Sequence, residues 1–221
     1  SLPTNWVNTG ENLGSGTGSD GTPNGILPSV TITNANVTNA NFGIEELPTP
    51  ATLTAASQVN PGGTTSVTVP PSTFAATDPN GGTITSITIT SFPTNATTIT
   101  INGTTYTSGT FPVGGVTIPT NANGEPTQPI TVDPVDGIVN VAIPYTATDN
   151  AGQTSVVTGT ANVPFGTVSL SGTVFNDVNG ATDNTVNGTG LGNPSSTPLY
   201  ANLLDASNNV VATTTVNANG T

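Results

Sequence analysis

The 221-residue chain contains no lysine, arginine, histidine, cysteine or methionine. Its twelve aspartate and glutamate residues therefore stand without a counter-charge, and the formal net charge is −12. A chain without cationic side chains has nothing to hold a phosphate backbone, which excludes nucleic acid as a partner. The usual general bases, thiol nucleophiles and zinc ligands are also missing. We therefore expect a scaffold and not an enzyme.

Hydrophobic residues make up only 33% of the chain and aromatic residues 5%, both low for a globular domain. The sequence has no apolar run near the roughly 20 residues of a membrane span, so we expect no membrane insertion. Low hydrophobicity with unbalanced charge is also typical of disorder, and an extended disordered stalk is one alternative. However, the uncharged majority is rich in threonine, valine and isoleucine, which favour strands, and 26 glycines and 19 prolines punctuate them. This pattern predicts an all-β protein.

The central segment, residues 47–165, has the pattern of one immunoglobulin-like sandwich, because short strands recur about every ten residues. Asn102-Gly103 separates two strand-like runs and tolerates the positive φ angles of a two-residue hairpin. Asp149–Gly152 is a second predicted turn. The candidate strands are Thr64–Val69, Thr83–Ser91, Thr97–Ile101, Thr104–Thr107, Gly115–Ile118, Ile130–Asp133, Ile138–Ala147 and Ser155–Val163.

The segments on either side of the central one have different sequence patterns. The first begins rich in turn residues, and then Ser29–Thr33 alternates as a half-buried strand does. Glu45–Pro50 has two prolines and is predicted to be a stiff linker. The second flank contains two strand-like runs, Leu199–Leu204 and Val210–Val216, joined by a predicted turn.

Several short segments of the sequence resemble known protein families. Ser171–Gly180 and Leu203–Ala212 resemble the start of a Cna-B/SdrD-B-like domain, a small prealbumin-like sandwich of bacterial surface proteins. Thr31–Ile44 resembles the final strands of the same domain type. Phe92–Tyr106 and Ala147–Gly152 resemble immunoglobulin-like repeats of the giant gliding adhesins of Bacteroidota (SprB type), which the type 9 system exports.

The resemblance implies tandem β-sandwiches. Residues 1–46 would be the C-terminal part of one Cna-B-like domain, residues 47–165 an Ig-like domain, and residues 166–221 the N-terminal part of the next Cna-B-like domain. The flanks together have about the length of one small sandwich. We therefore expect one period of a longer repeat array, interrupted inside a domain at both ends and completed by neighbouring repeats of the same chain.

The function that this resemblance implies is structural and adhesive. The chain would be a repeat of an extended filament on the extracellular cell surface, acting in attachment to a surface polysaccharide or substratum and in gliding motility. Because lysine is absent, the Lys–Asn isopeptide bonds common in Cna-B-like domains cannot form. Two alternatives remain open: a calcium-dependent carbohydrate-binding module, and a subunit of a non-covalent pilus joined by donor strands.

Calcium is the one cofactor that the residues suggest. Asp177, Asn179 and Asp183 place oxygen side chains at positions 1, 3 and 7 of a glycine-containing loop, and the related domains carry a similar loop as a calcium site. No glutamate stands at position 12 to close the site. The alternative reading is a loop whose Asx turns satisfy their own backbone.

A second group of acids surrounds the predicted linker. Glu45 and Glu46 begin it, and Asp78 and Asp149 stand in loops of the following domain. Linker and loop acids together are an arrangement that holds calcium between modules, although aspartate also favours turns without any ligand. Asp133 and Asp136 form a third, weaker pair.

Overall fold

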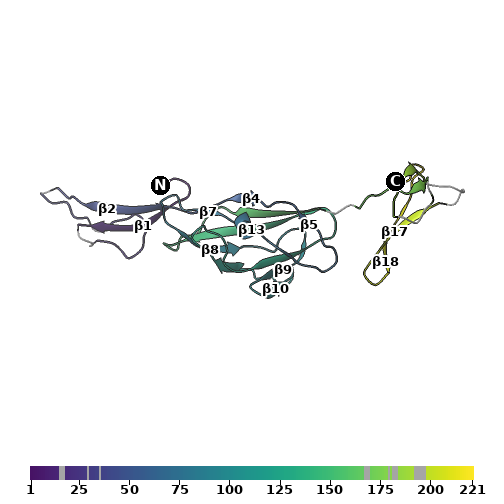
Figure 1. Ribbon diagram of the computed structural model, residues 1–221. Coiled ribbons are helices and arrows are strands. Elements are labelled where there is room, and N and C mark those ends of the chain that lie inside the picture. Colours follow the sequence, from purple (N-terminus) through teal and green to yellow (C-terminus); the bar gives the residue numbers. More distant parts are fainter. Residues whose placement is uncertain are drawn as a thin grey trace. The chain divides into compact units, whose positions relative to one another are not determined.

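The computed structural model describes residues 1–14, 18–28, 30–34, 36–166, 170–178, 180, 184–191 and 198–221. The chain divides into two compact units, Ser1–Thr167 and Val168–Thr221, which we call unit 1 and unit 2. The predicted all-β fold is confirmed, because strands dominate both units (Figure 1) and the only helix in the described residues is the 3₁₀ turn η1 (Pro71–Thr73). Within those residues, no helix has the length and apolar character needed to cross a membrane.

Two sheets form the sandwich of unit 1. The first has the order β11-β8-β13-β14-β4, with β5 also paired to β14, and the second has the order β10-β9-β12-β6. Figure 1 shows β9 and β10 on one side of unit 1 and β4 and β13 on the other. The strands of the first sheet are β11 (Val116–Pro119), β8 (Ile84–Ile89), β13 (Val139–Asp149), β14 (Gly159–Gly166), β4 (Thr52–Thr54) and β5 (Gln58–Val59). Those of the second are β10 (Thr104–Tyr106), β9 (Ala96–Ile101), β12 (Ile130–Pro134) and β6 (Val67–Thr68).

The core lies between these sheets, and strict alternation places it there. In β13, buried Val141, Ile143 and Tyr145 alternate with half-buried neighbours, and β14 repeats the pattern on the adjacent strand. Branched side chains suit this surface because they are stiff and fill the space between pleats. The buried cluster comprises Val69, Phe74, Ile87, Ile89, Ile99, Ile101, Ile118, Ile130, Val132, Val141, Ile143, Tyr145, Ala161, Val163 and Phe165.

The hairpin turn predicted at Asn102-Gly103 is present in the structure. Asn102 and Gly103 have φ angles of 48° and 79°, and Thr104 pairs with Ile101 across the hairpin from β9 to β10. At the predicted turn after β13, Gly152 adopts φ 83° and its N–H donates to the Asp149 carbonyl at 3.2 Å. Both turns depend on local residues alone.

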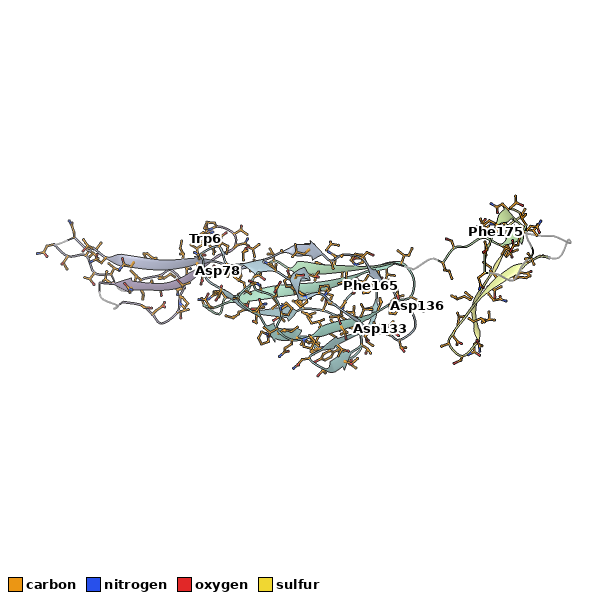
Figure 2. All side chains as sticks on the ribbon, viewed as in Figure 1. Trp6, Asp78, Asp133, Asp136, Phe165 and Phe175 are labelled. Carbon is orange, nitrogen blue, oxygen red and sulfur yellow. The ribbon has the colours of Figure 1, made fainter. Side chains whose placement is uncertain are left out.

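Two pairings in the first sheet are parallel. Strands β4 and β5 both run parallel to β14, with Leu53 opposite Ala161 and Gln58 opposite Phe165. The chain thus enters the sandwich through β4 and leaves it through β14, side by side in the same direction. In Figure 2, Asp78 marks the entry end and Phe165 lies near the exit end.

A two-stranded hairpin precedes the sandwich. It consists of β1 (Trp6–Leu13) and β2 (Ala40–Glu46), which pair antiparallel from Trp6 opposite Glu46 to Leu13 opposite Ala40. Glu11 is buried in β1, and its carboxylate accepts hydrogen bonds from the Ser19 hydroxyl at 3.2 Å and the Gly25 N–H at 3.1 Å. These bonds hold the long connection against the hairpin.

The connection from hairpin to sandwich is packed rather than a free linker. Leu47 is only 5% exposed, and its N–H donates to the Asn5 carbonyl at 2.7 Å. The strand β3 (Thr49–Pro50) follows at once and pairs with β7 (Ala76–Thr77). The prediction of a linker at Glu45–Pro50 is therefore wrong, because this segment consists of the end of β2, the strand β3 and the buried residues Leu47 and Pro48 between them.

The prediction of a strand at Ser29–Thr33 is also wrong over residues 30–33. Ser29 lies outside the described residues, and residues 30–33 are not in a strand. Ile32 is 75% exposed. Alternation alone does not form a strand here, because β1 and β2 pair with each other and leave this segment in the loop between them.

The described residues of unit 2 form two small sheets. Strand β15 (Phe175–Asp177) pairs with β16 (Gly188–Gly190), and β17 (Tyr200–Leu204) pairs with β18 (Val210–Thr215). The last two match predicted strands closely. Among the described hydrophobic residues of unit 2, only Val216 is buried, at 7% exposure.

Candidate functional site

Three carboxylates converge where the hairpin meets the sandwich. Glu45 comes from β2, Asp78 follows β7, and Asp149 ends β13. One carboxylate oxygen from each lies within 4.8 Å of the others. We call these three residues the carboxylate cluster. The chain has no cationic side chain to neutralise it.

Asp149 is held firmly by its own turn. Its side chain is 1% exposed, and Oδ1 accepts hydrogen bonds from the N–H groups of Ala151 at 2.9 Å and Gln153 at 2.8 Å. The other oxygen, Oδ2, is buried and has no hydrogen-bond partner among the described residues. A buried acceptor without a partner costs free energy, which makes this oxygen the most informative atom of the site.

The two carboxylate oxygens of Asp78 also differ in their surroundings. Oδ1 accepts from the Asn80 N–H at 2.8 Å, which forms an Asx turn. Oδ2 faces Gly82, where a Cβ atom would lie 2.1 Å from Oδ2 and 2.4 Å from Asn150 Oδ1. A Cβ atom at this position would displace both oxygens, which are close neighbours. Asn150 Oδ1 also accepts from the Thr83 N–H at 2.7 Å.

Burial and neighbouring charge both act on the Glu45 carboxyl. Partial burial raises the pKa of this carboxyl above its ordinary value, and the negative charges of Asp149 and Asp78 raise the pKa further. Three carboxylates so placed repel one another when all are ionised. A cation or a proton at the site would relieve that repulsion.

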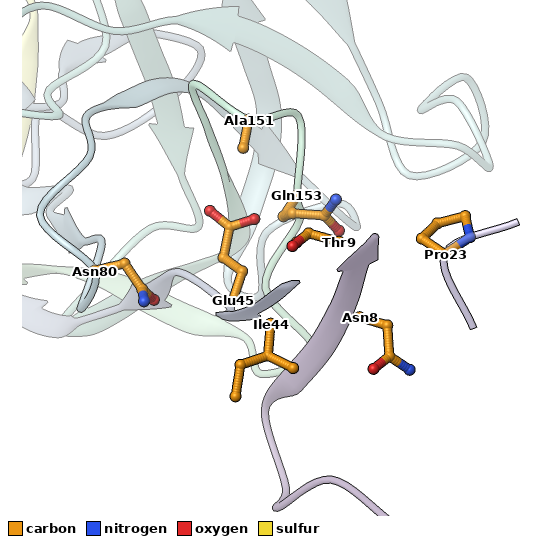
Figure 3. A pocket seen from close by; sticks show the side chains of 8 residues that line it. All are labelled: Asn8, Thr9, Pro23, Ile44, Glu45, Asn80, Ala151 and Gln153. Carbon is orange, nitrogen blue, oxygen red and sulfur yellow. The ribbon is translucent and has the colours of Figure 1, made fainter. Parts of the chain in front are cut away.

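A shallow cavity of about 470 Å³ adjoins the cluster (Figure 3). Glu45 lines it together with Asn8 of the hairpin and Asn80 and Gln153 of the sandwich. Figure 3 shows the Glu45 side chain extending from β2 toward the loop that carries Ala151. The cavity therefore gives solvent and small ions access to Glu45, the member of the cluster that lines it.

The acidic residues predicted as metal ligands around the linker do not all come together. Glu45, Asp78 and Asp149 come together, whereas Glu46 is not in the group. Side chains alternate along a strand, so Glu46 lies on the opposite face of β2 from Glu45. The Glu46 N–H instead donates to Asn80 Oδ1 at 2.8 Å.

The other predicted metal ligands are not assembled in the same way. Asp177 lies in β15 of unit 2, where its Oδ1 is buried without a partner among the described residues. Asn179 and Asp183 lie outside the described residues. Asp133 is buried in β12 and accepts from the Thr97 hydroxyl, whereas Asp136 accepts from the Gly63 N–H at 2.8 Å.

Sequence reasoning overlooked two residues of the site, Asn150 and Gly82. The signal for Asn150 was its place directly after Asp149 in a turn, and the signal for Gly82 was its place four residues after Asp78. No family model, curated protein or solved structure matches this chain. The carboxylate cluster offers oxygen ligands only, and this donor set suits hard cations such as calcium.

Proposed function

We propose that this chain is a load-bearing structural segment of an extended adhesin filament on the extracellular cell surface. The observation that carries the proposal is the parallel pairing of the entry strand β4 with the exit strand β14. Attachment to a polysaccharide or substratum, and gliding of the cell that carries the filament, would both place such a segment under tension.

Parallel pairing of entry and exit strands determines how tension acts on the sandwich. The chain enters at the N-terminal end of β4 and leaves at the C-terminal end of β14, so tension slides one strand along the other. All inter-strand bonds are then loaded together and none can break alone. They include the Ala55 N–H to the Asn162 carbonyl at 2.9 Å and the Asn60 N–H to the Gly166 carbonyl at 2.8 Å.

Side chains reinforce both ends of this pairing. At the entry, the Tyr145 hydroxyl lies 2.7 Å from the carbonyl oxygen of Ala51. At the exit, Asn60 Nδ2 donates to the carbonyls of Val135 and Gly137, each at 2.8 Å. We define the force clamp as β4, β5 and β14 with these two anchors.

The composition fits the same role. A net charge of −12 without any basic side chain makes parallel copies repel, which keeps filaments apart and soluble. Unit 2 leaves Leu203, Leu204, Val210 and Val211 between 47% and 57% exposed. We propose neighbouring repeats of the same chain as the partners that cover this apolar surface.

A matched pair of proline substitutions tests the clamp. Ala55→Pro removes the N–H that donates to β14, whereas Thr54→Pro removes one that faces the open edge, because donors alternate along a strand and β4 is the edge strand. Single-molecule stretching from the chain termini should show a lower unfolding force for Ala55→Pro and a nearly unchanged force for Thr54→Pro. Forced unfolding reports the rate of unfolding, so denaturant melts should be measured beside it.

Equal forces for the two variants and the unaltered chain would argue against a load-bearing clamp. Location needs its own test. An antibody raised against residues 47–166 should label intact, unpermeabilised cells that express the native protein. Labelling only after permeabilisation would contradict the cell-surface proposal while leaving the clamp untouched.

A further inference from the structure

We propose that the carboxylate cluster is a binding site for a divalent cation of the calcium type, and that the bound ion fastens the β1–β2 hairpin to the sandwich. Two independent observations carry this. The oxygens of Glu45, Asp78 and Asp149 converge within 4.8 Å, and Asp149 presents a buried Oδ2 without a partner among the described residues. The site stands whether or not the chain bears load.

The spacing fits calcium. Calcium binds oxygen at about 2.3–2.6 Å, so two oxygens on opposite sides of one ion are up to roughly 5 Å apart. The three cluster oxygens fall within that limit. Only small side-chain movements are needed for them to share one ion, and Asp149 and Asp78 are already fixed by their Asx turns.

The donor set selects a hard cation. Asn150 Oδ1 adds a neutral oxygen close to Asp78 Oδ2 beside Gly82. A carbonyl oxygen has two lone pairs, so Asn150 can accept from Thr83 and still face a cation. The chain has neither cysteine nor histidine to favour zinc or copper. Water entering from the adjoining cavity would complete a coordination number of six to eight.

The location gives the ion a structural consequence. Glu45 belongs to the hairpin, whereas Asp78, Asp149 and Asn150 belong to the sandwich. A shared ion would therefore bridge the two parts of unit 1, next to the hydrogen bond from the Glu46 N–H to Asn80. It would also replace repulsion among three carboxylates by attraction to a common charge.

Metal titration of the full chain tests the site. Trp6 is the only tryptophan and pairs with Glu46 in the hairpin, so it can sensitise the luminescence of terbium, an ion that takes calcium positions. We expect saturable terbium luminescence that excess calcium displaces, and calcium binding in calorimetry. Glu45→Gln and Asp78→Asn should each weaken calcium binding by about tenfold or more.

Glu46→Gln is the matched control, because it makes the same chemical change one residue away on the other face of β2. It should leave calcium affinity unchanged. Gly82→Ala adds a second, uncharged test, because its Cβ would displace Asp78 Oδ2 and Asn150 Oδ1. Gly109→Ala, with open space around its Cβ, serves as its control. Far-UV circular dichroism should confirm that each variant is folded.

Hydrogen exchange supplies a readout of the bridge itself. Calcium should slow exchange of the Glu46 and Leu47 amides in the unaltered chain and leave it unchanged in Glu45→Gln. The proposal is overturned if millimolar calcium produces no binding. It is also overturned if binding persists with equal affinity in Glu45→Gln, which would place the ion elsewhere, for example near Asp177.

Discussion

Replacing Tyr145 with phenylalanine isolates the anchor at the entry of the force clamp. The Tyr145 side chain is fully buried in β13, and its hydroxyl accepts from the Ala75 N–H at 3.0 Å. The hydroxyl oxygen also lies 2.7 Å from each of the carbonyl oxygens of Ala51 and Ala75, which share its single proton. One atom therefore joins the start of β4, the segment before β7 and the centre of the sheet.

The expected loss of stability depends on which contacts Tyr145→Phe keeps and which it removes. The ring keeps its place and its edge-to-face contact with Phe74, at a centroid distance of 5.2 Å, so no cavity opens. A net hydrogen bond worth about 1 kcal/mol is lost, and the partly buried Ala75 N–H loses its acceptor at a cost of about 1–2 kcal/mol. We expect the free energy of unfolding to fall by about 2–3 kcal/mol in total.

Equilibrium denaturation followed by far-UV circular dichroism measures this loss. The fluorescence of Trp6 is unsuitable as the main signal because Trp6 lies in the hairpin and not in the sandwich. Tyr106→Phe is the control: Tyr106 packs edge-to-face on Phe111 at a centroid distance of 5.6 Å, and its hydroxyl makes no hydrogen bond with the described residues. If the two variants differ by less than about 0.5 kcal/mol, the anchoring role of Tyr145 is refuted.

Three further predictions concern the core, the junction and unit 2. Ile87→Ala should lower the free energy of unfolding by about 2–5 kcal/mol, because Ile87 is 0% exposed, whereas Val113→Ala at an exposed site should change it by less than about 0.5 kcal/mol in the same denaturation assay. Burial and the neighbouring carboxylates raise the pKa of Glu45 in the folded state, so folding favours its protonated form. In the absence of calcium, the Leu47 amide should therefore exchange more slowly as the pH falls from neutral through that raised pKa toward 4.5, after correction for the intrinsic pH dependence of exchange. Glu45→Gln should remove this change. Because Val216 is the only buried residue among the described hydrophobic residues of unit 2, amides in β17 and β18 should exchange long before those in β13 and β14; equal protection would contradict this reading.

Local signals made part of the fold predictable. Asn102-Gly103 specifies its hairpin through two residues that accept positive φ, and the alternation of β13 and β14 follows from burial of one face. The strands β3, β4, β5 and β7 were not predicted, because each has two or three residues. Strands so short carry no periodicity, and the partner of β4 lies far along the chain in β14.

The candidate site was predictable only in part for a similar reason. Asp78 and Asp149 stand out in sequence because each opens a turn, and both belong to the cluster. The choice between Glu45 and Glu46 depends on the register of β2, since a shift of one residue reverses which side chain faces the sandwich. The contribution of Asn150 depends on its approach to Gly82, which the fold alone establishes.

The central claim is that tension shears β4 along β14, and the direction of pulling tests it most directly. The chain has no cysteine, so Thr52→Cys and Thr158→Cys can supply unique handles at exposed positions beside the same end of the two strands. Pulling through these handles should peel the bonds apart one by one at low force. Pulling through the chain termini should load them together and require a clearly higher force to open the sandwich. Equal unfolding forces in the two directions would contradict the account.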